Sequence, residues 1–414
     1  MSGFVARTEA AVGAHDPLSV RALVVDGTGV VTVDVVGLDE DTCRRIRERC
    51  GDVGDVVVHA THTHGGPVSM RDRLGDRLDE DWLHRLEDAA VDAAHEAAAR
   101  REAADLTALS APDPDVARNR RRHDGPVDRE LPVVLLRRPD GTTLATVVSY
   151  ACHPVVLGAD NLRFTADYPG VVRRLVEDDL GGVALFLTGC AGDANTGHTA
   201  AASVTTAPTA GRTYAASADV GTRIARAVLD GVRHRERVGG AADAASDPAS
   251  AAGPRAVSAV RREVALALDV PSPEQLRDEA TRWEESARAA SDEAQRALFR
   301  SWARWAATAG AAGVDRWHGQ VTVLRWGPAT LVCLPGEPFA ATARAVRAVS
   351  GPGVTLVAGY CDGCPGYLPP AEEYPYGGYE VVDAHRYYGM PGPFAAGSAE
   401  RLVAVVEEIA AAGG

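Results

Sequence analysis

The sequence predicts an α/β protein with mixed β-sheets in a layered core flanked by helices. Three observations support this fold class. Apolar strand-like runs alternate with amphipathic helical runs, several neighbouring strands are joined by hairpin-length turns, and 46% of the residues are hydrophobic. Strands that alternate with helices favour parallel pairing, whereas hairpins require antiparallel pairing, so we expect mixed sheets. We also expect residues 1–414 to form a single domain.

The first half of the chain is expected to alternate between strands and helices. Turn residues and hydrophobic periodicity predict two short strands within 21–35, a helix over 38–51, a strand over 55–64, a helix over 78–104, strands over 131–138 and 142–154, a helix over 164–182, a strand over 183–195 and a helix over 215–236. The strand over 183–195 runs into a glycine-rich loop. This order of elements is typical of a sheet covered by helices.

The second half begins with two expected insertions. Residues 237–256 are small and polar, which predicts a flexible loop, and residues 273–312 predict a helical hairpin rich in Arg, Glu and Ala. The hairpin could be a lid, an interface or an outer layer. A strand pair over 320–337, a helix over 338–351 and a closing helix over 394–412 follow.

Composition excludes several classes of chemistry. The chain has 43 basic and 57 acidic residues, a net charge of −14, and every basic residue is arginine. Mechanisms that need a Schiff-base or phosphate-binding lysine are therefore excluded. The acidic balance argues against nucleic acid and anionic membranes as partners. No signal peptide or membrane span is apparent and the seven cysteines form no disulfide framework, so we expect a cytoplasmic protein. Cys361 and Cys364 form a lone CxxC pair without an assigned function.

Residue types that bind metals stand at the ends of three expected strands. His62 and His64 end the strand over 55–64, where a two-residue spacing would place both side chains on one face. His153 and Glu337 end two later strands. Imidazoles and a carboxylate with an open position are the composition of a catalytic zinc site. Each residue also has a structural interpretation, His153 as a buried core histidine and Glu337 as a carboxylate beside a helix N-terminus; together they favour a metal.

The amino-acid sequences of these segments resemble motifs of the catalytic domain of the neutral/alkaline non-lysosomal ceramidase family. The resemblance rests on HATHTHGGP at 59–67, ACHPVVLGADNLRFTADYPG at 151–170, FLTGCAGDAN at 186–195, LPGEP at 334–338 and YLPPAEEYPYGGYE at 367–380, with DPLSVRALVVDG at 16–27 as the opening strand. These motifs occur in the family's order over most of the chain. The resemblance implies a ceramidase-like layered fold.

The resemblance also implies roles for individual residues. His62, His153 and Glu337 would bind Zn²⁺, with Tyr367 as a fourth, weaker oxygen ligand and His64 beside the metal. Arg120 would help to hold the substrate, and Tyr379 would donate a hydrogen bond to the developing oxyanion. We further expect Asp167 and Asp193 to orient the ligating imidazoles, and Asn195 to lie with them around the metal ligands.

Two departures from the family pattern bear on function. Asn195 stands where the family's Gly-Asp loop has a serine, so a serine nucleophile is excluded there and metal-activated water is favoured. The family's signal peptide and C-terminal β-sandwich domain are not recognised, which puts ceramide itself in doubt as the substrate. We expect a small-molecule substrate, and the oligomeric state is open, with a homodimer as one option.

The leading hypothesis is a zinc-dependent amidohydrolase that cleaves a small polar N-acyl compound. Three alternatives keep the same zinc site, namely an ester hydrolase, an amide-forming acyltransferase of secondary metabolism, and a true ceramidase. A binding or structural protein on a decayed scaffold is a fourth alternative. The intact histidine, glutamate and tyrosine motifs argue against decay.

Overall fold

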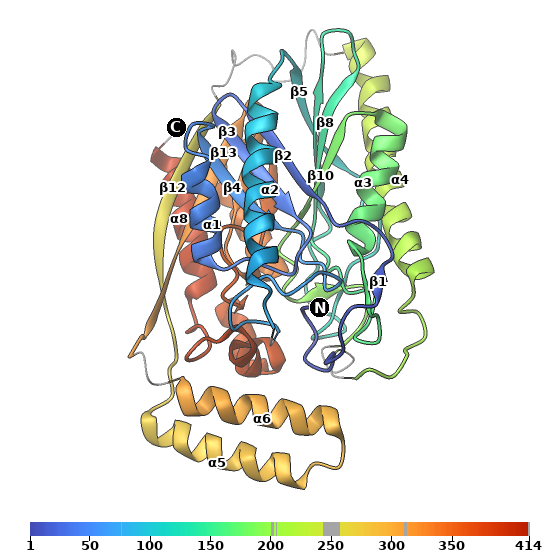
Figure 1. Cartoon of the computed structure of the whole chain (residues 1–414). Coiled ribbons are helices and arrows are strands. Elements are labelled where there is room, and N and C mark those ends of the chain that lie inside the picture. Colours follow the sequence, from blue (N-terminus) through green and yellow to red (C-terminus); the bar gives the residue numbers. More distant parts are fainter. Residues whose placement is uncertain (76, 200–202, 204, 243–256, 310–312, 413–414) are drawn as a thin grey trace.

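The computed structural model describes residues 1–75, 77–199, 203, 205–242, 257–309 and 313–412 (Figure 1). Within these ranges the strands gather into three larger sheets. The first contains β2 (Val20–Val25), β3 (Thr28–Val33) and β4 (Asp55–Ala60); the second β5 (Asp105–Ala111), β7 (Leu131–Arg137), β8 (Thr143–Tyr150) and β10 (Val183–Thr188); the third β12 (Ser258–Ala267), β13 (Arg316–Trp326), β14 (Ala329–Cys333) and β16 (Val354–Ala358).

Each of the three sheets is mixed, as the sequence predicted. β3 pairs with β4, β8 with β10 and β14 with β16 in parallel, whereas the remaining neighbours within the sheets are antiparallel. The three sheets share one apolar core, to which Val57, Val147 and Leu331 contribute buried side chains from the first, second and third sheet. The strand ends that this arrangement brings together form the site described below.

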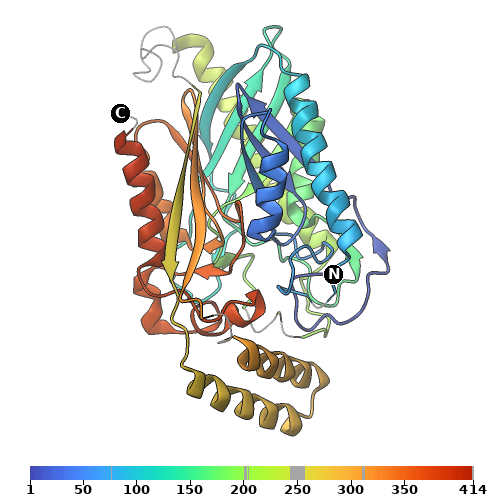
Figure 2. The ribbon, with the colours of Figure 1, turned by 60° about the vertical axis from the view of Figure 1, so that its left-hand side comes forward.

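Helices cover the outer faces of the sheets (Figures 1 and 2). α3 and α4 pack against the second sheet, and their apolar faces share a core with it. α1, α2, α7 and α8 enclose a further core with the first and third sheets. The bounds are α1 (Glu40–Arg49), α2 (Glu80–Ala99), α3 (Asp167–Leu180), α4 (Tyr214–Ala242), α7 (Ala340–Val349) and α8 (Ser398–Ala412). The result is the expected layered core with helices outside.

Side-chain hydrogen bonds fix where some of the helices begin. The Asp39 carboxylate accepts a hydrogen bond from Thr42 N at the start of α1. Ser272 and Gln275 form a reciprocal capping box at the start of α5 (Pro273–Ala289). α5 and α6 (Glu293–Thr308) pack against each other and extend from one end of the molecule (Figures 1 and 2). Residues 273–312, expected as a helical hairpin, thus contain two helices, while 310–312 lie outside the described residues.

Several element boundaries differ from those expected. Residues 237–242 continue α4 instead of beginning a loop, because adding residues to a helix that is already nucleated is easier than starting one, and 243–256 lie outside the described residues. Pro338 belongs to the short strand β15 (Glu337–Pro338), and α7 starts only at Ala340. β5, β12 and β16 were not anticipated. Among the described residues no helix is long and apolar enough to cross a membrane, and all seven cysteines are buried as free thiols.

Candidate metal centre

Three segments that are distant in the sequence meet where β4, β8 and β14 end. His62 and His64 follow β4, His153 follows β8, and Glu337 follows β14 in β15. His62, His153 and Glu337 are completely buried. The structure therefore brings together the four side chains that the sequence singled out at strand ends.

The segment that carries His62 and His64 is irregular rather than extended. β4 ends at Ala60, and His62 has a φ of 63°, in the left-handed region that non-glycine residues rarely adopt. The expectation that both histidines lie on one face of a strand is therefore wrong, although their rings do converge. The Thr61 hydroxyl donates a hydrogen bond of 3.0 Å to Asp34 and helps to hold this backbone in place.

Asp34 belongs to a buried ion pair beneath this segment. Both of its carboxylate oxygens accept hydrogen bonds from the Arg173 guanidinium, at 2.7 and 2.6 Å, and Ser19 donates a further bond. Burial opposes ionisation of Asp34, but Arg173 and Ser19 outweigh it and hold its pKa below the usual value. α3, which carries Arg173, is thereby tied to the histidine segment.

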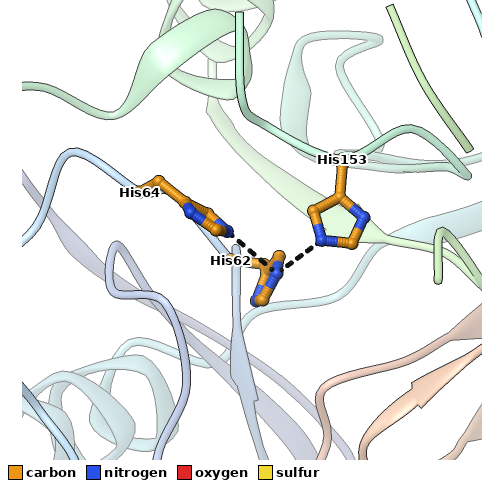
Figure 3. A group of neighbouring side chains, drawn as sticks. All are labelled: His62, His64 and His153. Atoms are coloured by element: carbon orange, nitrogen blue, oxygen red, sulfur yellow. Dashed lines mark hydrogen bonds between the residues drawn. The ribbon is translucent and has the colours of Figure 1, made fainter. Parts of the chain in front are cut away.

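The histidine rings face one another through their Nε2 atoms (Figure 3). His62 Nε2 lies 2.9 Å from His153 Nε2 and 3.2 Å from His64 Nε2. His62 Nδ1 is bonded to the Val36 carbonyl and His153 Nδ1 to the Ala191 carbonyl, the latter at 2.7 Å. Because a carbonyl oxygen only accepts, both Nδ1 atoms carry the proton and both Nε2 atoms present lone pairs.

This donor set fits a metal ion. Burial lowers the pKa of His62 to about 3 and that of His64 and His153 well below the usual value, so the rings are neutral at pH 7. Two neutral acceptor nitrogens 2.9 Å apart cannot bond to each other, whereas a shared cation satisfies both. Glu337 Oε2 lies 3.1 Å from His153 Nε2 and 3.4 Å from His62 Nε2. Tetrahedral donors about 2.0–2.1 Å from one Zn²⁺ are about 3.3 Å apart, which matches these separations.

Two sets of three donors share His62 and His153. One adds His64, and these three histidines form a group that could hold a metal. The other adds Glu337, whose Oε2 lies within 3.4 Å of both shared nitrogens. His64 has a short nitrogen contact with His62, and its Nδ1 is buried without a partner among the described residues. Because Glu337 Oε2 and the Nε2 atoms of His62 and His153 are all within 3.4 Å of one another, they favour Glu337 as the third ligand. His64 would then lie beside the ion.

Two tyrosine hydroxyls lie beside the Glu337 carboxylate. Tyr388, in the short helix η4 (Ala384–Tyr388), donates a hydrogen bond to Oε1, and the Tyr360 hydroxyl lies 3.4 Å from Oε2. β15 also pairs with β17 (Tyr367–Leu368), which places Glu337 opposite Tyr367. The carboxylate thus presents Oε2 to the histidines while Tyr388 engages its other oxygen.

Arg120 is anchored on two sides. It follows β6 (Arg118–Asn119), which pairs with β11 (Ala194–Asn195), and its backbone N donates to Asp193 O at 2.9 Å. Its guanidinium donates to the Tyr367 hydroxyl and to Glu380, each at 2.8 Å. Burial alone would lower its pKa, but Tyr367 and Glu380 raise it well above the usual value. Arg120 is therefore a permanent cation that positions Tyr367.

A network of arginines and glutamates surrounds this anchor. Arg121 donates to Glu380 at 2.7 Å and to Glu373 at 3.2 Å, and Arg122 donates to Glu373 at 2.5 Å. The two glutamates belong to the short helices η2 (Ala371–Tyr376) and η3 (Tyr379–Asp383). The network consequently fixes the segment that carries Tyr379.

A cavity of about 960 Å³ reaches His64 of the histidine cluster. His64, Arg120, Tyr367 and Tyr379 line its inner part, and the exposed residues Asp72 and Arg77 lie at its rim. The Tyr379 ring contacts that of Tyr367 edge-on, with centroids 5.7 Å apart. Arg120 and Tyr379 therefore lie where a molecule beside the histidines would meet them.

Three expected polar residues do not contact the imidazoles. The Asp167 carboxylate accepts hydrogen bonds from Tyr168 N, Leu157 N and the Ser217 hydroxyl. The Asp193 carboxylate accepts from Ala340 N and Asn119 Nδ2, and burial raises its pKa to about 7. Asn195 closes the turn over 195–198. The expectation that Asp167 and Asp193 orient the rings is therefore wrong, since backbone carbonyls of Val36 and Ala191 do so.

Several residues that shape the centre were not predicted from the sequence. Tyr388 holds Glu337 and Tyr360 lies beside it, Glu380 holds Arg120, and Asp34 supports the histidine segment. Glu380 carried a signal, because it is the last residue of the YLPPAEEYPYGGYE motif. The two tyrosines carried none that spacing could reveal.

Comparison with known proteins identifies the fold. Neutral ceramidase from Pseudomonas aeruginosa superposes with a TM-score of 0.69 at 16% identity, covering 100% of this chain and 71% of that structure. A ceramidase in complex with C2 gives a TM-score of 0.70 at 16% identity, with 100% and 72% coverage. No family model and no curated protein sequence matches the chain. The fold of this chain is therefore the one found in these ceramidase structures, as the motif resemblance implied.

Proposed function

We propose that the chain is a zinc-dependent amidohydrolase that cleaves the amide bond of a small polar N-acyl substrate. The observation that carries the proposal is the set of neutral nitrogen and carboxylate donors that face one point directly behind His64, which lines a cavity. The likeness of the fold to that of ceramidases supports amide hydrolysis. The resemblance in sequence motifs supports the same reaction. The charged rim residues Asp72 and Arg77 support a substrate with a polar group.

His62, His153 and Glu337 would hold the ion, with the Tyr367 hydroxyl as a weaker oxygen ligand. When bound, zinc would supply a water nucleophile active at neutral pH and polarise the amide carbonyl. Tyr388 keeps Glu337 oriented toward the histidines. The free thiols support the further proposal that the enzyme works in a reducing compartment such as the cytoplasm.

The protein's own groups supply the remaining steps. The Tyr379 hydroxyl donates a hydrogen bond to the oxygen that develops negative charge, a contribution of about 3 kcal/mol. Arg120 holds polar oxygens of the substrate with the guanidinium edge that its anchors leave toward the cavity. His64, neutral at pH 7, accepts the proton that the attacking water gives up and returns it to the leaving amine.

The test combines metal analysis with product analysis. Purified protein is expected to contain about one equivalent of zinc, and chelation followed by zinc addition is expected to abolish and restore amide hydrolysis. His62→Ala and His153→Ala should lose both metal and activity. Activity that survives in metal-free protein and in both variants would contradict the proposal. Product analysis with and without an added amine separates hydrolysis from acyl transfer.

A further inference from the structure

The α5–α6 hairpin is attached to the body of the protein through one side of α6. Trp305 Nε1 donates a hydrogen bond of 2.7 Å to the Met390 carbonyl, and the Trp305 ring contacts His385 edge-on at 4.9 Å. Trp305 also packs with Leu276 of α5 in a small apolar cluster. This attachment places α6 beside η4, and both helices contribute residues to the lining of the cavity that reaches His64.

Arg386 of η4 is the centre of this attachment. Its side chain is only 6% exposed, and it pairs with Asp383 at 2.7 Å and with Glu279 of α5 at 3.1 Å. The guanidinium also lies over the rings of Trp302 and Trp305, 4.9 and 5.0 Å from their centroids. A buried cation held by two carboxylates and two indole faces fixes those indoles in turn.

A row of aromatic rings connects the metal centre with the hairpin. Tyr367 contacts Tyr379, Tyr379 contacts Tyr387, and Tyr387 contacts Trp302, with centroid separations of 5.7, 5.8 and 6.2 Å. All four rings line the cavity. The row therefore forms a continuous apolar wall that begins beside the proposed zinc ligands and ends on α6.

The two faces of α6 differ as a cavity wall requires. Leu298, Ser301 and Trp302 recur at helical spacing and line the cavity. Arg300 and Arg304 are exposed and line a groove on the other side of the hairpin. A purely solvated outer layer would not direct a leucine and a tryptophan into the substrate cavity.

We propose that α6 determines which acyl groups the enzyme accepts. Trp302, with Leu298 and Ser301, forms the far wall against which the apolar end of the acyl group lies, and Arg386 is a positioning residue that holds Trp302 there. The acyl side is assigned because the aromatic row starts at Tyr367, whose ring stacks on that of His153 at 6.4 Å, whereas His64, which serves the leaving amine in the proposed reaction, packs against Phe4 at 4.8 Å. This inference rests on the proposed amidohydrolase function and narrows its substrate to a small compound whose polar group is separate from the apolar end of its acyl group.

The experiment compares p-nitroanilides of acetic, butanoic and octanoic acid. For the unchanged chain we expect kcat/KM to rise with acyl length. Trp302→Ala should lower kcat/KM for the octanoyl anilide about tenfold while changing that for the acetyl anilide less than about twofold. Ser301→Trp, which fills the far end of the cavity, should produce the same selective loss without removing any packing. Arg300→Ala, on the outer face of the same helix, is the matched control and should leave the acyl-length profile unchanged.

Arg386→Met tests the positioning role. It should flatten the acyl-length profile as Trp302→Ala does, whereas damage to the protein as a whole would lower the rates on all three anilides equally. Such a uniform loss in Trp302→Ala and Arg386→Met, or an unchanged octanoyl preference in Ser301→Trp, would overturn the inference.

A second measurement separates this inference from the proposed function. Binding of the apolar dye N-phenyl-1-naphthylamine to the full-length protein is followed by fluorescence, which requires no turnover. We expect Trp302→Ala and Ser301→Trp to weaken dye binding about tenfold and Arg300→Ala to leave it unchanged. If no anilide is hydrolysed but the dye results hold, the proposed reaction fails while the apolar wall stands. If neither variant alters dye binding, or the unchanged chain binds no dye, the wall is refuted.

Discussion

The buried Tyr388 hydroxyl makes a specific prediction about metal affinity. Tyr388→Phe removes the hydrogen bond to Glu337 Oε1 and keeps the ring that packs around it. Without this donor the carboxylate loses its fixed orientation toward His62 and His153, and a buried charge loses a partner. We therefore expect the variant to fold and to bind zinc more weakly.

Two independent considerations agree on the magnitude. A hydrogen bond to a charged group contributes about 1.5–3 kcal/mol. Loss of a group that orients a metal ligand lowers metal affinity about 10–100-fold, which corresponds to about 1.4–2.8 kcal/mol. The expected rise in the zinc Kd of Tyr388→Phe is thus about 10–100-fold.

The assay is competition with a chromogenic chelator at fixed pH. Tyr360→Phe is the matched control, because the Tyr360 hydroxyl lies at 3.4 Å from Glu337 and its ring also stays in place. Its zinc Kd should change less than about threefold, since a contact of this length is weak. A zinc Kd in Tyr388→Phe within twofold of the unchanged chain, or a larger effect in Tyr360→Phe, would refute the reasoning.

Three further predictions concern ligand identity, pH and stability. Glu337→Gln should lose zinc at limiting metal, whereas His64→Ala should keep about one equivalent and lose about 100-fold in kcat, as metal analysis and kinetics can check; loss of zinc in His64→Ala would make that histidine a ligand. Burial raises the folded-state pKa of Asp193 to about 7, above its unfolded value, so its contribution to stability is complete below about pH 4 and is lost as the pH rises to 7. As the pH rises from about 4 to 7, the unfolding free energy of Asp193→Asn minus that of the unchanged chain should increase by as much as about 4 kcal/mol. If urea titrations show that this difference stays constant with pH, the prediction is contradicted. Arg173→Met leaves the Asp34 carboxylate buried without its cation and should cost about 3–5 kcal/mol of unfolding free energy, measured by denaturant titration; a cost below about 1 kcal/mol would show that the pair is unimportant.

Local sequence patterns were sufficient to predict the fold class and the proposed ligands. His62, His153 and Glu337 each follow an apolar strand and precede a Gly or Pro turn, and these are local features that periodicity reveals. The motif resemblance then assigned roles that strand ends alone left open. The mixed sheets followed from hairpins such as β2–β3, whose turn is visible in the sequence.

Contacts between distant residues could not be predicted in the same way. Tyr388 meets Glu337 across 51 residues and Arg120 meets Glu380 across 260, and no local pattern encodes such pairs. The left-handed backbone of His62 also departs from what its strand-like neighbours indicate, because tertiary contacts such as Thr61–Asp34 hold it. Asp167 and Asp193 had the right residue type for orienting an imidazole, but nearby backbone amides engage their carboxylates instead.

The assembly of the centre from three distant segments has a consequence for unfolding. His62 and His153 are separated by 91 residues, and Glu337 lies far beyond both. All seven cysteines are free, so no disulfide links these parts of the chain. A zinc ion bound here would act as a removable cross-link between the first sheet, the second sheet and β15. Because the donors converge only in the folded chain, free zinc at 1,000 times its Kd would add about 4 kcal/mol to the unfolding free energy. Melting temperatures should therefore follow the zinc concentration of the buffer.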